Sequence, residues 1–413
     1  MRLTSRNYSP SILGKIIRSC ARQPSFEETA DVLQDLAELT ISGRQAGRIA
    51  HEVGQQLKTH RDLQVEKFEA GQLKPRVETR PALALVGVDG GRLQIRREGE
   101  GPGSHDPSWR EDKIALLATA TITVANSDPE PDLPECFRDQ KWVEELFRGI
   151  SGEGPMNPAE TQEDAPADSN PEADDQPASA RKRPELLVRT YVASTCTSDE
   201  FGPMVAAEAQ TRNFGNAAHR AFLGDGSAWI WKLQQEYFPT FEAIIDFLHA
   251  MGHVYTAAKA AETKMEKRWG LFQEWAEACW KGQVGDVVEQ LRVLGDSQVS
   301  SEEAEVSAPS EDEPRKILQQ ELGYLEHNRN RMDYPRYRQQ GLPWTTSYVE
   351  STVKIFNRRV KGSEKFWGET GAEAILLLRA AFLSEDEQLA RHLKNRPISP
   401  FRNYKAREDR EAA

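Results

Sequence analysis

Residues 219–226 read His219-Arg220-Ala221-Phe222-Leu223-Gly224-Asp225-Gly226, a short apolar run that ends in an aspartate between two glycines. The run predicts a β-strand, and the glycines predict that the strand ends there. A helix is predicted directly afterwards, over residues 229–235. A strand end places side chains at the rim of a sheet, and flanking glycines let a ligand approach the backbone closely. Asp225 is therefore the first candidate functional residue of an α/β fold.

A second aspartate occupies a similar position earlier in the chain. Residues 82–88 (ALALVGV) form an apolar run of strand type that ends at Asp89-Gly90-Gly91, and residues 92–96 alternate as a half-buried strand does. The glycine pair between them predicts a tight hairpin turn. Further strands are predicted over 113–124 and 243–247, and a helical or mixed segment over 186–193.

Helical periodicity dominates the second half of the chain. The predicted helices cover residues 200–211, 249–262, 266–280, 284–294, 316–330, 347–359 and 371–383. Strands come first, then alternating strand and helix, then a mostly helical block. This order predicts an α/β sheet that carries a helical insertion.

Two more helices are predicted near the N-terminus. Ser25-Phe26-Glu27-Glu28 is a capping box that opens the first, and Ser42 caps the second after a short break. Arg44 and Arg48 lie on the polar face of the second helix, near its start. The pair resembles a helix-turn-helix whose second helix enters the major groove of DNA. An ordinary helical hairpin explains the same pattern.

The negative charge of the chain is concentrated in two segments. The 413 residues carry 53 Lys and Arg against 65 Asp and Glu, a formal net charge of −12. Residues 151–180 hold eight acids and 296–313 hold seven, with no base in either, and the remainder comes to +3. Both segments are too polar to pack, so we expect them to be disordered linkers. The acidic total therefore does not exclude DNA as a partner.

Several classes of protein are disfavoured by composition. The four cysteines are far apart, which argues against a zinc cluster and against a disulfide framework. No apolar run reaches the roughly 18 residues of a membrane span. The first residues are not followed by an apolar signal core. We therefore expect a cytoplasmic protein with no membrane partner.

A third acid completes a set with Asp89 and Asp225. Glu350 lies in the first turn of a predicted helix, after Gly341-Leu342-Pro343. Three carboxylates at one point repel one another unless cations neutralise them, and hard oxygen ligands suit Mg²⁺. Two such ions about 4 Å apart can activate a hydroxyl and stabilise the leaving oxygen of a phosphodiester. Taken singly, each acid is better explained as a turn residue or a partner of the helix dipole.

A chain of motifs around these acids resembles a known family. In order, they are Val88-Asp89-Gly90-Gly91-Arg92, residues 223–231 (LGDGSAWIW), residues 245–250 (IDFLHA), Gly341-Leu342-Pro343, Val349-Glu350-Ser351, Lys354, Asn357, Arg359-Val360-Lys361-Gly362, Lys365-Phe366-Trp367 and residues 371–380. Together they resemble the DDE transposases of the ISKra-type bacterial insertion sequences, which are related to Mutator-like elements. The resemblance covers roughly residues 81–385.

The resemblance implies an RNase H-like mixed sheet interrupted by an all-helical insertion, with an N-terminal helical domain and disordered acidic linkers. It implies Asp89, Asp225 and Glu350 as the catalytic, metal-binding triad, with two Mg²⁺ ions, or Mn²⁺ in their place. It implies DNA cleavage at transposon ends and transfer of the 3′-hydroxyl to target DNA. A homodimer or larger assembly on DNA is expected, because two ends must be paired, and so is nucleoid association. The N-terminal helical region is expected to cover residues 1–80. The catalytic domain is expected in three parts, 81–150, 186–255 and 341–385, with the first linker at 151–185. The insertion is expected at 256–340, with a disordered stretch at 296–314, and a basic tail at 386–413.

Supporting residues follow in the same way. Asp246-x-x-His249 matches a motif that related transposases place near the active site, where His249 would contact DNA or the leaving group; a structural histidine is about as well supported. Lys354, Arg358 and Lys361 follow Glu350 at helical spacing, and such a basic face would grip the DNA backbone. A solvated charged face is the ordinary explanation of that spacing.

Two other functions stay open at this point. The chain lacks the cysteine-rich segment usual before the first acid, and Trp344-Thr345-Thr346-Ser347-Tyr348 replaces a glycine-containing segment. An inactive or domesticated descendant that binds DNA without cutting it fits these departures. A glycosidase-like hydrolase with paired carboxylates is a third possibility, although the basic C-terminal region favours a polyanion.

Overall fold

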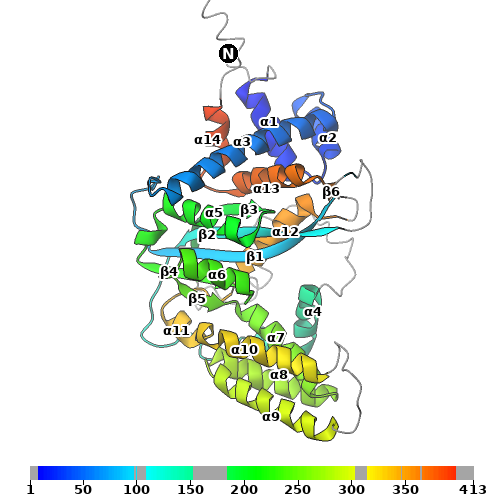
Figure 1. The fold of residues 1–413 in the computed structure, drawn as a ribbon, viewed down its shortest axis with the longest axis vertical. Coiled ribbons are helices and arrows are strands. Elements are labelled where there is room, and N and C mark those ends of the chain that lie inside the picture. Colours follow the sequence, from blue (N-terminus) through cyan, green and yellow to red (C-terminus); the bar gives the residue numbers. More distant parts are fainter. Residues whose placement is uncertain are drawn as a thin grey trace, which may run out of the picture. The chain divides into compact units, whose positions relative to one another are not determined.

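The computed structural model describes residues 8–96, 99, 108–151, 184–302, 314–345, 347–362 and 365–396. The chain divides into two compact units (Figure 1). The first unit combines Met1–Thr121, Leu186–Glu242 and Ser347–Ala413. The second combines Ile122–Glu185 and Ala243–Thr346.

A mixed sheet of six strands organises the fold, which confirms the α/β class. Strand β1 pairs antiparallel with β2 and parallel with β4 and β6, and β2 pairs antiparallel with β3. The order is β3-β2-β1-β4-β5, with β6 beside the end of β1. The strands are β1 (Leu83–Ile95), β2 (Trp109–Ala120), β3 (Leu186–Ser194), β4 (His219–Gly224), β5 (Glu242–Ile245) and β6 (Phe366–Trp367).

The hairpin expected at the glycine pair is wrong. Strand β1 runs without a break through Gly90 and Gly91, which pair with Lys113 and Asp112 of β2. Gly91 is needed for a close approach: a Cβ there would lie 2.7 Å from Oδ1 and 2.9 Å from Oδ2 of Asp112. A glycine pair can therefore mark a place where a neighbouring strand comes close, and not only a turn.

The helical or mixed segment expected over residues 186–193 is also wrong, because these residues form β3. The segment pairs along its length with β2, from Ala120 with Leu186 to Lys113 with Ser194. A nine-residue apolar run shows neither a clear helical nor a clear strand periodicity. Pairing with the backbone of β2 therefore decides that it forms a strand.

Two pairs of helices pack on the sheet in the first unit. Helices α12 (Ser347–Val360) and α13 (Glu369–Leu383) share a hydrophobic cluster with Leu93 of β1 and Ile114 of β2. The other face meets α5 (Ser198–Thr211) and α6 (Ala228–Tyr237), since Lys113, which precedes Ile114, lies 5.3 Å from the Trp229 ring centroid. Alternate residues of β1 and β2 therefore face different helix pairs.

The N-terminal helices belong to the same unit: α1 (Pro10–Arg22), α2 (Phe26–Ala37) and α3 (Gly43–Glu69), together with α14 (Gln388–Asn395). The caps at Ser25 and Ser42 are confirmed, since each accepts a hydrogen bond from the backbone N–H three residues later. Helix α1 was not predicted, although its buried residues recur at helical spacing from Leu13 to Ala21. These helices share their core with α13 and the sheet.

The second unit is mostly helical and takes in the segment from Ile122 as well as the residues from Ala243 onward. Its helices are η1 (Glu135–Arg138), α4 (Gln140–Ser151), α7 (Phe247–Ala261), α8 (Met265–Trp280), α9 (Val284–Glu302), α10 (Pro314–Asn328), η4 (Arg329–Arg331) and α11 (Tyr334–Gln339); the short helix η3 (Phe214–Asn216) belongs to the first unit. Phe247 is central to its core, with edge-on contacts to Phe137, Trp280, Tyr334 and Trp344.

The expected linkers are only partly testable. The disordered stretch expected at 296–314 is wrong at its start and end, because α9 continues to Glu302 and α10 begins at Pro314. Residues 303–313 lie outside the described residues, as do 152–183 of the first linker and 397–413 of the basic tail. Within the described residues, no helix combines the length and apolar character needed to span a bilayer.

Candidate active site

Asp89 lies in β1, and Asp225 directly follows β4, the neighbouring parallel strand. The register of β1 and β4 runs from Leu83 with His219 to Gly87 with Leu223; Asp89 lies two residues further along β1, and Asp225 lies one residue beyond the end of β4. Because side chains alternate along a strand, Asp89 lies on the side of the sheet that α12 and α13 cover. The end of β4 thus brings Asp225 beside Asp89, which lies inside β1 and not at a strand end as expected.

Local hydrogen bonds fix both carboxylates. Asp89 is half-buried, and its Oδ1 accepts a hydrogen bond from the N–H of Gly90 at 2.7 Å. Asp225 is also half-buried, and Ser227 donates to it twice, from its N–H to Oδ1 at 2.8 Å and from its Oγ to Oδ2 at 3.0 Å. The two hydrogen bonds from Ser227 also hold the turn between β4 and α6. Asp225 therefore has a structural role in addition to any chemical one.

The glycines around Asp225 have reasons of their own. A Cβ on Gly224 would lie 2.6 Å from Cγ2 of Ile230 in α6, which explains the absence of a side chain there. Gly226 has a φ of 107°, a conformation that other residues rarely adopt. Both glycines therefore serve the sharp passage from β4 into α6, and ligand access is not required to explain them.

Glu350 lies in the first turn of α12, as predicted. Helix α12 packs on β1 and β2, on the face where Asp89 lies, through Val353 and Phe356. The side chain of Glu350 lies outside the described residues.

The basic face expected on α12 is smaller than predicted. Lys354 and Arg358 are exposed and lie one turn apart. Lys361 follows the end of the helix, and its Nζ lies 5.8 Å from the ring centroid of Trp109. The neighbouring Arg359 is buried and donates to the carbonyls of Cys20 and Pro24, so it anchors α12 to the N-terminal helices. Among the described side chains of α12, Lys354 and Arg358 form the exposed basic pair.

Arg44 and Arg48 are exposed on the first two turns of α3, while Ile49 and Val53 on its other face are buried. The turn between α2 and α3 includes Glu38 in the left-handed conformation, with φ 52°. Helix, short turn and helix are therefore present, with two arginines one turn apart available to a nucleic acid backbone.

Asp246 and His249 form a pair within the second unit. Asp246 is fully buried and caps α7 through a hydrogen bond from the N–H of Leu248 at 3.0 Å. Its other oxygen lies 3.0 Å from Nδ1 of the half-buried His249. The pair has a local structural explanation, since the aspartate caps the helix and fixes the orientation of the imidazole ring.

Sequence reasoning did not select Asp112, which the structure brings close to Asp89. Asp112 lies on β2 opposite Gly91 and is completely buried. Burial raises the pKa of its carboxyl to about 6; its own backbone N–H opposes this rise, and the charges of Asp89 and Glu111 add to it. The only sequence signal was Gly91, whose missing side chain gives space to this carboxylate.

The donor chemistry of this edge fits Mg²⁺. Asp112 of β2 and Asp89 of β1 offer oxygen ligands on one face of the sheet, and Asp225 directly follows the neighbouring strand β4. Among the described side chains, no three His, Cys, Asp or Glu residues are grouped closely enough to be metal ligands. The side chain of Glu350 is outside that set.

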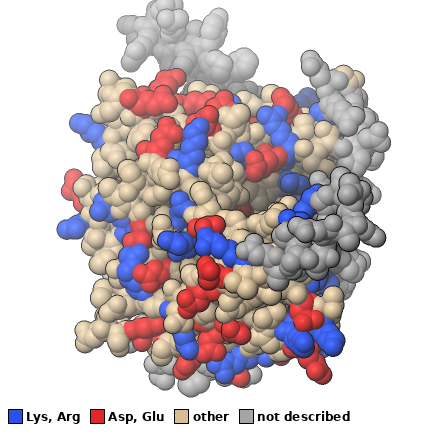
Figure 2. Space-filling model, turned by 60° about the horizontal axis from the view of Figure 1, so that its bottom comes forward, with Lys and Arg blue, Asp and Glu red and all other residues tan. Residues whose placement is uncertain are grey.

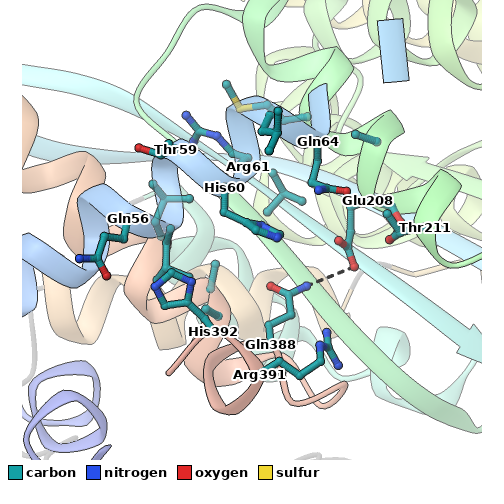
Figure 3. Close-up of a pocket in the computed structure, with 18 of the residues that line it drawn as sticks. Gln56, Thr59, His60, Arg61, Gln64, Glu208, Thr211, Gln388, Arg391 and His392 are labelled. Carbon is teal, nitrogen blue, oxygen red and sulfur yellow. Dashed lines mark hydrogen bonds between the residues drawn. The ribbon is translucent and has the colours of Figure 1, made fainter. Parts of the chain in front are cut away.

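A separate pocket of about 730 Å³ lies in the first unit, between α3, α5, β3, α13 and α14 (Figure 3). Glu208 is its central acid and accepts hydrogen bonds from Gln388 at 3.2 Å and from Arg76 at 3.3 Å. Burial lowers the pKa values of His60 and His392 on opposite walls. None of the acids Asp89, Asp112 and Asp225 lines this pocket.

Figure 2 shows Lys and Arg side chains interspersed with Asp and Glu on the face that it presents. No large area of one sign is seen among the described residues of that face. The described residues of that face therefore present mixed charges and no broad positive surface.

A scan of the chain against models of protein families gives no match, and a search of the curated proteins gives none either. These two comparisons therefore identify no family for the chain.

Proposed function

We propose that this chain is a DDE transposase with an RNase H-like catalytic core, which binds transposon ends and target DNA as a homodimer or larger assembly. Its reaction is hydrolysis at the transposon ends followed by transfer of the 3′-hydroxyl to target DNA. The observation that supports this best is the placement of Asp225 directly after β4, beside the strand β1 that carries Asp89, with the helix of Glu350 packed on the same side of the sheet as Asp89. Open α/β sheets commonly bind ligands at the carboxyl ends of their strands.

Different residues of the chain would bind the metal ions and the DNA. Asp89 and Asp225 would provide oxygen ligands from a rigid sheet, with Ser227 fixing the orientation of Asp225. Bound Mg²⁺ supplies activation of the attacking hydroxyl and charge stabilisation of the leaving oxygen. Lys354 and Arg358 would contact the DNA backbone beside the site, and Arg44 and Arg48 would contact it from α3.

A cleavage and strand-transfer assay tests the proposal. The full chain is incubated with Mg²⁺ and the DNA that flanks its coding region, and products are compared for wild type, Asp89→Asn and Asp225→Asn. Asparagine at 225 keeps an oxygen for the N–H of Ser227, so folding is preserved while the charge is lost. Both variants should lose at least about 100-fold in rate, since each removes a metal ligand. Asp199→Asn, an exposed acid of α5 paired with Lys232, is the control and should match wild type.

Two results would overturn parts of the proposal. Equal products from wild type and Asp225→Asn would exclude Asp225 from the triad. Specific DNA binding by wild type without any Mg²⁺-dependent product would instead identify a descendant that binds DNA and does not cut it.

A further inference from the structure

Asp112 is the most unusual acid of the described residues. It is completely buried, and neither carboxylate oxygen has a hydrogen-bond partner. Buried polar groups in native proteins are nearly always paired, and an unpaired one calls for an explanation such as a bound ion. An unpaired carboxylate in the interior is costly, so something must neutralise it in the working protein.

Asp112 lies on the same face of the sheet as Asp89. The oxygens lie over Gly91, where a Cβ would be 2.7 Å from Oδ1. Gly91 and Asp89 are two residues apart on β1 and therefore share a face of the sheet. Asp112 and Asp89 are thus diagonal neighbours, and residues so placed lie about 7–8 Å apart, with their Cβ atoms somewhat closer. Carboxylates at this separation can share one ion with metal–oxygen distances of about 2.0–2.1 Å.

Other ways of neutralising Asp112 leave its oxygens without partners. A proton would remove the charge, but it would not supply a hydrogen-bond partner to either oxygen. The charge of Lys361 lowers the pKa of Asp112, yet its Nζ lies 5.8 Å from the ring centroid of Trp109 and makes no hydrogen bond to the carboxylate. Lys113, next in sequence, faces the other side of the sheet, where it pairs with Glu111 at 2.8 Å. An ion with its waters would satisfy charge and lone pairs together.

We propose that Asp112 and Asp89 together bind one divalent cation, so that Asp112 is a fourth carboxylate of the site. Mg²⁺ is usually held by one or two protein carboxylates and keeps several waters, which matches what β1 and β2 offer. Because Asp89 is shared with the triad, the inference deepens the proposed function and rests on it for the role of the ion. Binding of the ion itself requires no DNA.

Direct titration of the full chain with Mn²⁺, with free Mn²⁺ followed by electron paramagnetic resonance, tests this. Asp112→Asn should weaken the affinity for Mn²⁺ by at least about tenfold. Glu111→Gln is the matched control, because it removes a neighbouring acid of the same strand that pairs with Lys113. That change should alter the affinity by less than about threefold, since the charge is partly screened by solvent. Equal affinities of wild type and Asp112→Asn would overturn the proposal.

Thermal unfolding gives a second readout that detects misfolding. Without Mn²⁺, Asp112→Asn should unfold at the same temperature as wild type or higher, because a buried unpaired charge is removed. With Mn²⁺, wild type should gain stability and Asp112→Asn should gain less. A variant that unfolds at lower temperature without Mn²⁺ would contradict the unpaired state of Asp112.

The two proposals can fail separately. Asp112-dependent Mn²⁺ binding without DNA cleavage by wild type would contradict only the transposase. DNA cleavage that requires Asp225, with Mn²⁺ affinity independent of Asp112, would contradict only the fourth carboxylate.

Discussion

At the scale of single residues, glycine has different meanings in this chain. Gly226 has a left-handed backbone and Gly224 leaves room for Ile230, so the glycines around Asp225 serve the local path of the chain. Gly91 instead leaves room for a carboxylate of another strand. The roles of Gly224 and Gly226 can be predicted from residues nearby in sequence. The role of Gly91 arises only when β1 and β2 pair.

His392 provides a prediction at the same scale. Its side chain lines the pocket of Figure 3, and burial, followed by Arg396 and His60, lowers its pKa to about 4. In the unfolded chain an ordinary histidine has a pKa of about 6.5, so between these values the unfolded state binds more protons. The contribution of His392 to stability is therefore constant above about pH 6.5 and falls as the pH decreases toward about 4.

His392→Gln should remove this part of the pH dependence. The free energy of unfolding, measured in urea at pH 7 and pH 5, should fall less for the variant than for wild type. His51→Gln, an exposed histidine of α3, should behave like wild type. The same loss between pH 7 and pH 5 in wild type and His392→Gln would contradict the assignment.

At the scale of elements, the contact of α3 with α13 depends on one residue. A Cβ on Gly54 would lie 2.5 Å from the carbonyl oxygen and 2.7 Å from the Cα of Ala374. These are backbone atoms, so relief requires the helices to move apart. The N-terminal helices share the hydrophobic cluster of α12 and α13, so the effect would spread to the helix of Glu350.

Gly54→Ala should therefore destabilise the chain by about 1–3 kcal/mol despite the higher helix propensity of alanine. Gly323→Ala in α10 is the control, because no atom lies within 4 Å of its added Cβ. That change should stabilise by up to about 1 kcal/mol. Urea denaturation measures both, and equal stability of the two variants would show that α3 can shift without cost.

At the scale of the whole molecule, the net charge of −12 describes segments that the sequence predicts to be linkers. Deleting residues 152–180 removes eight acids and no base. The described elements end at Ser151 in α4 and resume at Leu186 in β3, so no helix or strand of the structure is lost.

The deletion should leave the fold intact and tighten DNA binding, by up to about tenfold at low salt and less at high salt. Circular dichroism and salt-dependent binding measure the two effects. A variant with a neutral segment of the same length separates charge from chain length. Loss of folding, or weaker DNA binding, would contradict the prediction.

The sequence predicts the elements whose signals are local. Helices α7, α8, α10, α12 and α13 lie close to their predicted positions, because each buries a face at helical spacing. Strand β4 and the aspartate after it were likewise predicted. Strand β3 and the continuous β1 were not, because pairing with β2 decides both.

By itself, the sequence determined the α/β class, the helical block, the caps at Ser25 and Ser42, and Asp225 as the acid after a strand. These features depend on residues within a few positions of one another. The tertiary structure alone decided that Asp89 lies inside a strand, that Lys361 leaves the basic face of α12, and that Asp112 is buried opposite Gly91. Burial and strand pairing join residues that are distant in sequence, so a carboxylate without a partner becomes visible only in the folded chain.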